Sequence, residues 1–225
     1  MTTWYRFCRF LYRVYFRVYH RGRVLHADRV PATGAYILAG NHISFLDPPL
    51  FGQAVGRSAH YMARDTLFRH PVMGRLLKSW NVEPIARGKG DVGAFKTIMR
   101  LLREQKAVMM FPEGTRGREG SLQRARPGLG MIAARTHVPI VPMRITGSGN
   151  AMPRGAKLPR PVRITIAFGE PFLFPMPADF QSLSTDKQRN LYQAIGDEVM
   201  RRIAALPPLD QPLPVPTDQP TSIGT

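Results

Sequence analysis

Short apolar runs alternate with longer segments of helical periodicity along most of this chain. The predicted strands cover residues 36–40, 59–63, 82–86, 107–111, 139–145 and 162–168, and the predicted helices cover 48–55, 71–80, 93–104, 128–137 and 185–205. Such alternation is typical of α/β proteins, in which helices connect parallel strands. We therefore expect the α/β fold class: a single domain with a central mixed, largely parallel sheet flanked by helices, plus an N-terminal amphipathic helix.

The chain is strongly basic. Its 225 residues contain 32 Lys and Arg against 15 Asp and Glu, a formal net charge of +17. This charge indicates an acidic partner, which could be nucleic acid, an anionic membrane surface or a phosphorylated small molecule. Cys8 is the single cysteine, and the six histidines show no ligand spacing such as H-E-x-x-H. We therefore expect no disulfide framework, no metal and no cofactor.

The N-terminal segment WYRFCRFLYRVYFRVYHRGR, residues 4–23, combines aromatic side chains with regularly spaced arginines. Arg6, Arg9, Arg13 and Arg17 fall on one stripe of a helix, and Trp4 lies among the apolar residues of its other faces. Burying each arginine in a bilayer costs about 2.5 to 3.5 kcal/mol, so the helix is expected to lie on a membrane rather than cross it. These five residues are our predicted membrane contacts, in a peripheral or monotopic protein at the cytoplasmic face. The alternative is a helix docked on the protein's own core, with its arginines in water.

Three regions are expected along the chain. Residues 1–29 form the membrane-surface helix, and residues 30–206 form the α/β domain. Residues 207–225 are rich in proline and contain no Lys or Arg, which predicts a disordered tail.

A histidine and an aspartate follow the first predicted strand, in the stretch AGNHISFLDPP at residues 39–49. A short turn can fold the Asp47 carboxylate back toward the His42 imidazole, which then acts as a general base. No G-x-S-x-G elbow is present, so the base is expected to activate a hydroxyl of the substrate directly. Asp47 also precedes Pro48, where a helix N-cap would stand. The alternative is that Asp47 only caps the helix and His42 is an ordinary histidine.

Two further strand ends carry polar groups. In FPEGTRG, residues 111–117, Glu113, Thr115 and Arg116 surround Gly114, which lets backbone approach a ligand closely. The planar guanidinium of Arg116 suits a phosphate monoester, and Arg87 follows another strand. These groups predict a site for an anionic substrate with a free hydroxyl. The alternative is a set of surface turns with solvated charges.

In this order, the pieces resemble the glycerophospholipid acyltransferase family, specifically the 1-acylglycerol-3-phosphate acyltransferases. The stretches NHISFLDP, VEPIARG, FPEGTRG and VPIVPMRI are similar to the four successive motifs of that family, and the resemblance covers roughly residues 30 to 170. Two departures are Ala86, where an acid commonly precedes the arginine, and residues 125–128 (ARPG), where Phe-Lys often precedes a glycine. They leave the His-Asp pair intact and bear on acceptor preference.

The resemblance implies roles for these residues. His42 would deprotonate a hydroxyl of a lysophospholipid and Asp47 would orient it, and the alkoxide would attack acyl-CoA or acyl-carrier protein without a covalent acyl-enzyme. The residues that would bind the acceptor are Asn41, Arg87, Glu113, Gly114, Thr115 and Arg116. The preferred acceptor would be 1-acylglycerol-3-phosphate, giving phosphatidic acid.

Two alternatives to this function remain. A related acyltransferase would use another lysophospholipid, an amino-lipid or glycerol-3-phosphate. A basic nucleic-acid-binding module would explain the charge, but the sequence contains no zinc-finger, RRM or basic-zipper pattern.

Overall fold

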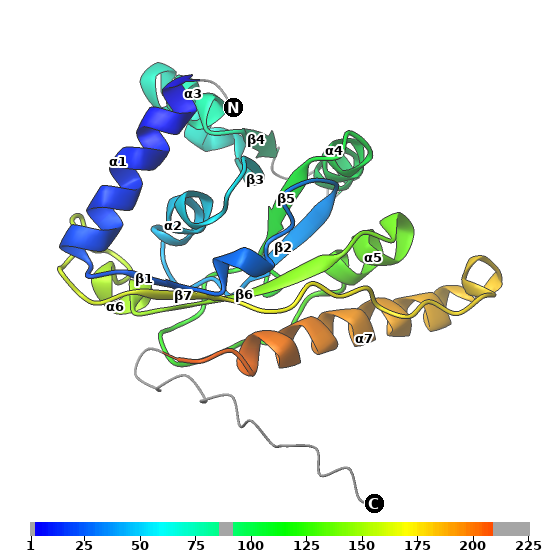
Figure 1. Cartoon of the computed structure of the whole chain (residues 1–225). Coiled ribbons are helices and arrows are strands. Elements are labelled where there is room, and N and C mark those ends of the chain that lie inside the picture. The colour runs from blue at the N-terminus through cyan, green and yellow to red at the C-terminus, as the bar shows by residue number, and fades with distance from the viewer. Residues whose placement is uncertain (1–2, 86–91, 209–225) are drawn as a thin grey trace, which may run out of the picture.

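A single mixed sheet forms the centre of the molecule (Figure 1). The computed structural model describes residues 3–85 and 92–208, and in that part of the chain seven strands pair in the order β1-β7-β6-β2-β5-β3-β4. The strands are β1 (Arg23–Leu25), β2 (Tyr36–Gly40), β3 (Ala59–Arg64), β4 (Val82–Ile85), β5 (Ala107–Met110), β6 (Ile140–Thr146) and β7 (Thr165–Phe168). Only the β6–β7 pair is antiparallel among these strands; the other five pairs are parallel. The predicted fold class is confirmed.

Helices cover both faces of this sheet (Figure 1). They are α1 (Thr3–Tyr19), α2 (Asp47–Ala54), α3 (Pro71–Ser79), α4 (Val92–Arg103), α5 (Pro127–Thr136), α6 (Ser148–Ala151) and α7 (Thr185–Ala204), with short 3₁₀ turns η1 (Ala27–Arg29), η2 (Asp65–Phe68) and η3 (Phe180–Ser182). The central strand β2 is buried along its whole length and alternates between two cores. Tyr36 and Leu38 join the core under α1 and α2, whereas Ile37 and Ala39 join the core under α4, α5 and α7.

The predicted elements agree with the structure to within about three residues at their ends. Two elements were missed: β1, which lies inside the 1–29 segment, and α6, which has only four residues. Strand β1 is short and becomes a strand because it pairs with β7, which begins 140 residues later. The sheet therefore starts at Arg23, before the predicted domain boundary at residue 30. Most of the predicted tail, residues 209–225, lies outside the described residues.

Helix α1 presents three different faces. One face packs on the body of the protein through the buried Tyr5, Cys8 and Phe16. Arg9 donates a hydrogen bond to the carbonyl of Gly56, two residues after the end of α2, and Arg13 donates one to the carbonyl of Gln53, in the last turn of α2. These two arginines thus hold α1 to α2, since the last carbonyls of a helix lack internal partners.

The third face of α1 is an exposed apolar stripe. We define the α1 stripe as the exposed side chains Trp4, Phe7, Leu11, Val14 and Val18. The alternative prediction, that the helix docks on the protein's own core, therefore holds for the face with the buried residues. The α1 stripe itself is exposed. Among the described residues, no helix is long and apolar enough to cross a membrane.

Candidate active site

His42 and Asp47 form a hydrogen-bonded pair in the turn between β2 and α2. The Nδ1 atom of His42 lies 2.8 Å from the Asp47 Oδ2 atom. A carboxylate can only accept, so Nδ1 carries the hydrogen and Nε2 is the basic nitrogen. The ring of Phe111 stacks on the imidazole at a centroid distance of 4.1 Å. The His42 side chain is 18% exposed, whereas the Asp47 side chain is fully buried. The pair therefore has one nitrogen available to a substrate.

The Asp47 carboxylate folds back onto the turn that carries His42. Its Oδ2 atom also accepts from the backbone N–H groups of Ile43 and Ser44, at 2.6 and 2.7 Å. The Oδ1 atom accepts from the Ser148 hydroxyl at 2.6 Å. The turn and the carboxylate thus fix each other.

The expected N-cap role of Asp47 is wrong. Leu46 is the N-cap of α2, and Asp47 is the first residue of the helix. Pro48 and Pro49 have no N–H to donate, and the N–H of Leu50 bonds to the carbonyl of Leu46. The carboxylate therefore finds its donors in the preceding turn.

The loop after β5 holds the backbone of His42 on both sides. Glu113 Oε1 accepts from the His42 N–H at 3.1 Å, and Oε2 accepts from the Gln123 N–H at 3.1 Å. The Gly117 N–H donates to the His42 carbonyl at 2.7 Å. Burial raises the pKa of Glu113, and its two backbone donors oppose that rise. The contacts of Glu113 indicate that it supports the turn that carries His42.

Asn41 continues the pairing of β2 with β6. Its side-chain amide donates to the Ile145 carbonyl at 2.9 Å and accepts from the Ile145 N–H at 2.8 Å. The residue is buried, so its amide serves the sheet. For Asn41 and Glu113, binding of substrate stays a prediction, because the contacts that the structure gives them are internal.

A group of arginines lies beside the His-Asp pair. The Arg116 guanidinium stands over the Phe45 ring, with its central carbon 3.6 Å from the ring centroid. Arg154 donates to the Arg116 carbonyl. Burial lowers the pKa of Arg116, and the positive charges of Arg154 and Arg64 add to that effect. Arg116 nevertheless stays a cation at neutral pH. We call Arg64, Arg116 and Arg154 the arginine group.

The remaining predicted residues are placed as follows. Gly114 has a φ of 67°, which disfavours other residues, and a side-chain carbon there would lie 2.6 Å from the Arg126 side chain. Thr115 is exposed next to it. Arg87 lies outside the described residues.

The structure adds residues that sequence patterns did not single out. Arg64 stands at the end of β3, Glu119 lies in the loop after β5, Ser148 begins α6, and Arg154 lies in the loop after α6. The ends of β2, β3 and β5 meet at one edge because these strands are parallel neighbours, which is where open α/β sheets bind ligands. No short motif marks these residues, although Arg64 could have been found as a polar residue at a strand end.

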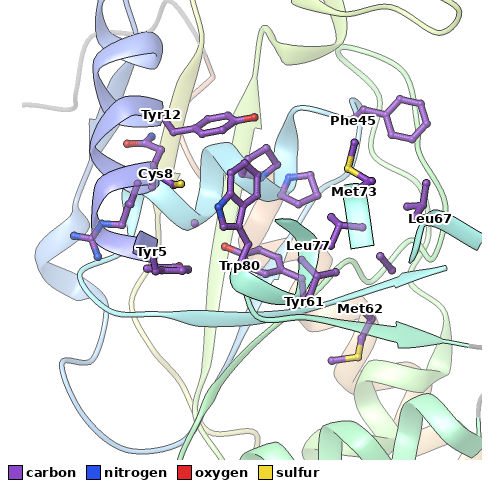
Figure 2. Close-up of a pocket in the computed structure, with 17 residues that line it drawn as sticks. Tyr5, Cys8, Tyr12, Phe45, Tyr61, Met62, Leu67, Met73, Leu77 and Trp80 are labelled. Atoms are coloured by element: carbon purple, nitrogen blue, oxygen red, sulfur yellow. The ribbon is translucent and has the colours of Figure 1, made fainter. Parts of the chain in front are cut away.

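An apolar cavity of about 370 Å³ lies next to this edge (Figure 2). Its walls come from α1, α2, β3 and α3. Tyr5, Cys8 and Tyr12 of α1 stand at one end of it, and Phe45, Leu67 and Met73 stand at the other. The Arg116 guanidinium stacks over the ring of Phe45, so the end of the cavity at Phe45 adjoins the arginine group.

Comparisons with known proteins agree with this geometry. A family model described as Acyltransferase matches residues 21–146. The 1-acyl-sn-glycerol-3-phosphate acyltransferase of Bacillus subtilis is 28% identical over 198 residues, covering 87% of this chain and 94% of that protein. The chloroplast 1-acyl-sn-glycerol-3-phosphate acyltransferase of Brassica napus is 34% identical over 123 residues, covering 54% of this chain. This chain matches only 36% of the length of the Brassica protein, and 34% of a similar protein from Arabidopsis thaliana.

One solved structure shares the fold over most of the chain. The crystal structure of the 1-acyl-sn-glycerophosphate acyltransferase of Thermotoga maritima superimposes with a TM-score of 0.66 and 20% identity, covering 89% of this chain and 80% of that one. The family model spans more than half of the 225 residues and includes the turn with His42 and the loop with Arg116. The resemblance noted in the sequence is thereby confirmed: the chain belongs to the acyltransferase family.

Proposed function

We propose that this protein transfers a fatty acyl group from a thioester to the free hydroxyl of a lysophospholipid, specifically 1-acyl-sn-glycerol-3-phosphate. The observation that carries the proposal is the His42–Asp47 pair, which shares its turn with Phe45, and Phe45 both contacts Arg116 and lines the apolar cavity. These features supply a base, a site for a phosphate and a site for a hydrocarbon chain. The names of the Bacillus and Brassica relatives support the same acceptor.

In the proposed mechanism, His42 Nε2 removes the proton from the acceptor hydroxyl as its oxygen attacks the thioester carbonyl. This attack forms the new carbon–oxygen bond and gives a tetrahedral intermediate. The intermediate collapses to the ester as the carbon–sulfur bond breaks, and the imidazolium returns its proton to the departing thiolate. The two nearby serines do not serve as nucleophiles in this scheme. Ser148 donates to Asp47, and the hydroxyl of Ser44 donates to the Met152 carbonyl at 3.3 Å. We therefore propose direct transfer without an acyl-enzyme, from acyl-CoA or acyl-carrier protein as co-substrate.

The apolar cavity is the proposed site of a fatty acyl chain. Its volume of about 370 Å³ falls within the range of about 300 to 1,000 Å³ typical of ligand pockets. One end adjoins Arg116 and therefore the reacting groups, and the other reaches α1. A chain that enters at Phe45 extends away from the polar edge of the sheet.

The arginine group is the proposed phosphate site. We expect Arg116→Ala to raise KM for the phosphorylated acceptor by about 10- to 100-fold, since hydrogen bonds to charged groups contribute strongly. KM for the thioester should stay nearly constant in steady-state assays. Arg189→Ala, an exposed arginine on α7, is the control. A loss confined to use of the acyl donor would show that Arg116 does not bind the acceptor.

The α1 stripe is the proposed contact with an anionic membrane, at the cytoplasmic face. Arg6 and Arg17 are exposed beside the stripe, whereas Arg9 and Arg13 are engaged with α2. The predicted set of membrane contacts therefore becomes Trp4, Arg6, Arg17 and the rest of the stripe, with Arg9 and Arg13 securing the helix.

A substitution within the α1 stripe tests this contact. We expect Phe7→Glu to weaken binding to vesicles that contain anionic lipid by about 10-fold or more, because a buried aromatic side chain contributes about 1.5 to 3 kcal/mol. Co-sedimentation with vesicles measures the effect. Leu158→Glu is the matched control, because it also replaces an exposed apolar side chain, 78% exposed, with glutamate, at a position outside the α1 stripe. Equal losses in the two variants would refute a specific role of the stripe.

A panel assay tests the function as a whole. Purified protein is mixed with anionic vesicles, one acyl-CoA or acyl-carrier protein, and acceptors that differ in headgroup, and the products are identified by mass spectrometry. We expect phosphatidic acid from 1-acyl-sn-glycerol-3-phosphate. Transfer to another lysophospholipid, an amino-lipid or glycerol-3-phosphate instead would establish a related acyltransferase. Binding of DNA with no acyl transfer would overturn the proposal in favour of a nucleic-acid-binding module.

A further inference from the structure

A third side chain completes the hydrogen bonding of the His-Asp pair. We infer that Ser148 is a positioning residue for His42 and Asp47, and that Glu119 holds Ser148 in place. The inference rests on the proposed function, because it assigns a role in that reaction. None of the sequence motifs includes Ser148, which is separated from Asp47 by 101 positions in the chain.

The two oxygens of Asp47 have unequal surroundings. Oδ2 accepts three hydrogen bonds, one of them from His42. Among the described residues, Oδ1 accepts from the Ser148 hydroxyl alone. Both side chains are fully buried, so water does not replace this donor. Without the hydroxyl, a buried carboxylate oxygen loses its partner, and the carboxylate, held through Oδ2 alone, is oriented less tightly toward His42.

Ser148 reaches Asp47 because the turn before α6 is tightly held. Glu119 spans that turn: its Oε1 accepts from the Gly147 N–H at 2.9 Å and its Oε2 from the Gly149 N–H at 3.0 Å. Gly147 has a φ of 88°, and a side-chain carbon there would lie 2.1 Å from the Arg163 carbonyl oxygen. The carboxylate of Glu119 therefore fixes the residues on both sides of Ser148, and glycine at 147 permits the turn.

The position of the hydroxyl excludes a direct part in the reaction. Ser148 has no exposed surface, and its hydrogen points at the carboxylate. Asp47 stands between it and the imidazole. Ser148 thus acts through Asp47, by holding its orientation and sharing its negative charge.

The charge shared with Ser148 affects the pH dependence of the reaction. Among the described residues, the other charged groups that face the pair are Glu113, from the loop after β5, and Arg116, which lies with Arg64 and Arg154 in the arginine group. When the hydroxyl is removed, more of the negative charge of Asp47 acts on the imidazole and favours its protonated form. The acidic limb of the pH–rate profile should therefore move to higher pH.

Ser148→Ala is the central test, made in the 225-residue protein with 1-acyl-sn-glycerol-3-phosphate and an acyl-CoA. We expect kcat to fall by about 10- to 100-fold, with KM changed less than about 2-fold. The acidic limb should move upward, and the downfield proton NMR signal of the His42 Nδ1–H should shift or broaden. Ser148→Thr, which keeps the hydroxyl, should restore most of kcat and the original signal. Glu119→Gln should give a smaller change in the same direction.

Thr165→Val is the control, because it removes a buried hydroxyl on β7 that makes no hydrogen bond to Asp47. It should leave the NMR signal of His42 unchanged, and thermal unfolding compares the stability of all variants. A Ser148→Ala protein with an unaltered pH profile and an unaltered His42 signal would overturn the inference and leave Ser148 a purely structural residue. The NMR measurement does not depend on turnover. A wild-type protein inactive in acyl transfer would refute the proposed function and leave the test of the hydrogen-bond chain valid.

Discussion

His42→Ala is expected to lower kcat for acyl transfer by about three orders of magnitude or more, since a positioned general base contributes about 10²- to 10⁴-fold and His42 also returns the proton to the leaving thiolate. The variant should remain folded, because the side chain is partly exposed and Asp47 keeps its bonds to Ile43, Ser44 and Ser148. Steady-state kinetics on anionic vesicles measures the loss.

Circular dichroism and vesicle co-sedimentation show whether the His42→Ala protein is otherwise intact. His137→Asn is the control, because His137 is exposed at the end of α5 and asparagine tolerates its positive φ of 50°. Turnover near the wild-type level in His42→Ala would remove the pair from the mechanism.

The second large effect is expected from Asp47→Asn, which should lower kcat by about 10³- to 10⁴-fold. In serine proteases, the corresponding change costs about 10⁴ because the imidazole adopts the wrong tautomer. Here three N–H groups and one hydroxyl point at the carboxylate, so an amide NH₂ must face at least one donor or turn the hydroxyl away. We also expect a loss of about 1 to 3 kcal/mol in the free energy of unfolding.

Kinetics together with chemical denaturation separate the two effects of Asp47→Asn. Glu198→Gln makes the same chemical change on α7, where ion pairs with Arg201 and Arg202 hold the pKa of Glu198 at about 2. That control should lose stability without losing kcat. If Asp47→Asn lost only stability, and kept kcat, Asp47 would have no part in orienting His42.

The sequence predicted the elements whose signal is local. The alternation of apolar runs with helical periodicity identified the six longer strands and the α/β class. It missed β1, whose three residues have no pattern of their own and depend on β7 for their hydrogen bonds. Similarly, the arginine spacing in α1 predicted an amphipathic helix. It did not reveal that Arg9 and Arg13 donate hydrogen bonds to carbonyls near the end of α2. Those contacts depend on how α1 packs against the rest of the protein.

The candidate site divides in the same way. His42 and Asp47 are separated by four residues in one turn, so their types and spacing already indicated a base with its orienting carboxylate. The N-cap prediction failed because the sequence does not tell in which direction a carboxylate points. The two prolines after Asp47 have no N–H to donate to its carboxylate. The N–H groups of Ile43 and Ser44, in the preceding turn, donate instead.

By itself, the sequence determined the fold class, the His-Asp turn, the Arg116 loop and the family, because each depends on residues close together in the chain. The tertiary structure alone decided which distant groups complete the site. Ser148 reaches the carboxylate of Asp47, Glu119 secures the turn of Ser148, and Arg154 joins Arg116. The physical reason is the parallel sheet: its neighbouring strands come from separate parts of the chain, and only their pairing brings the ends of those strands to one edge.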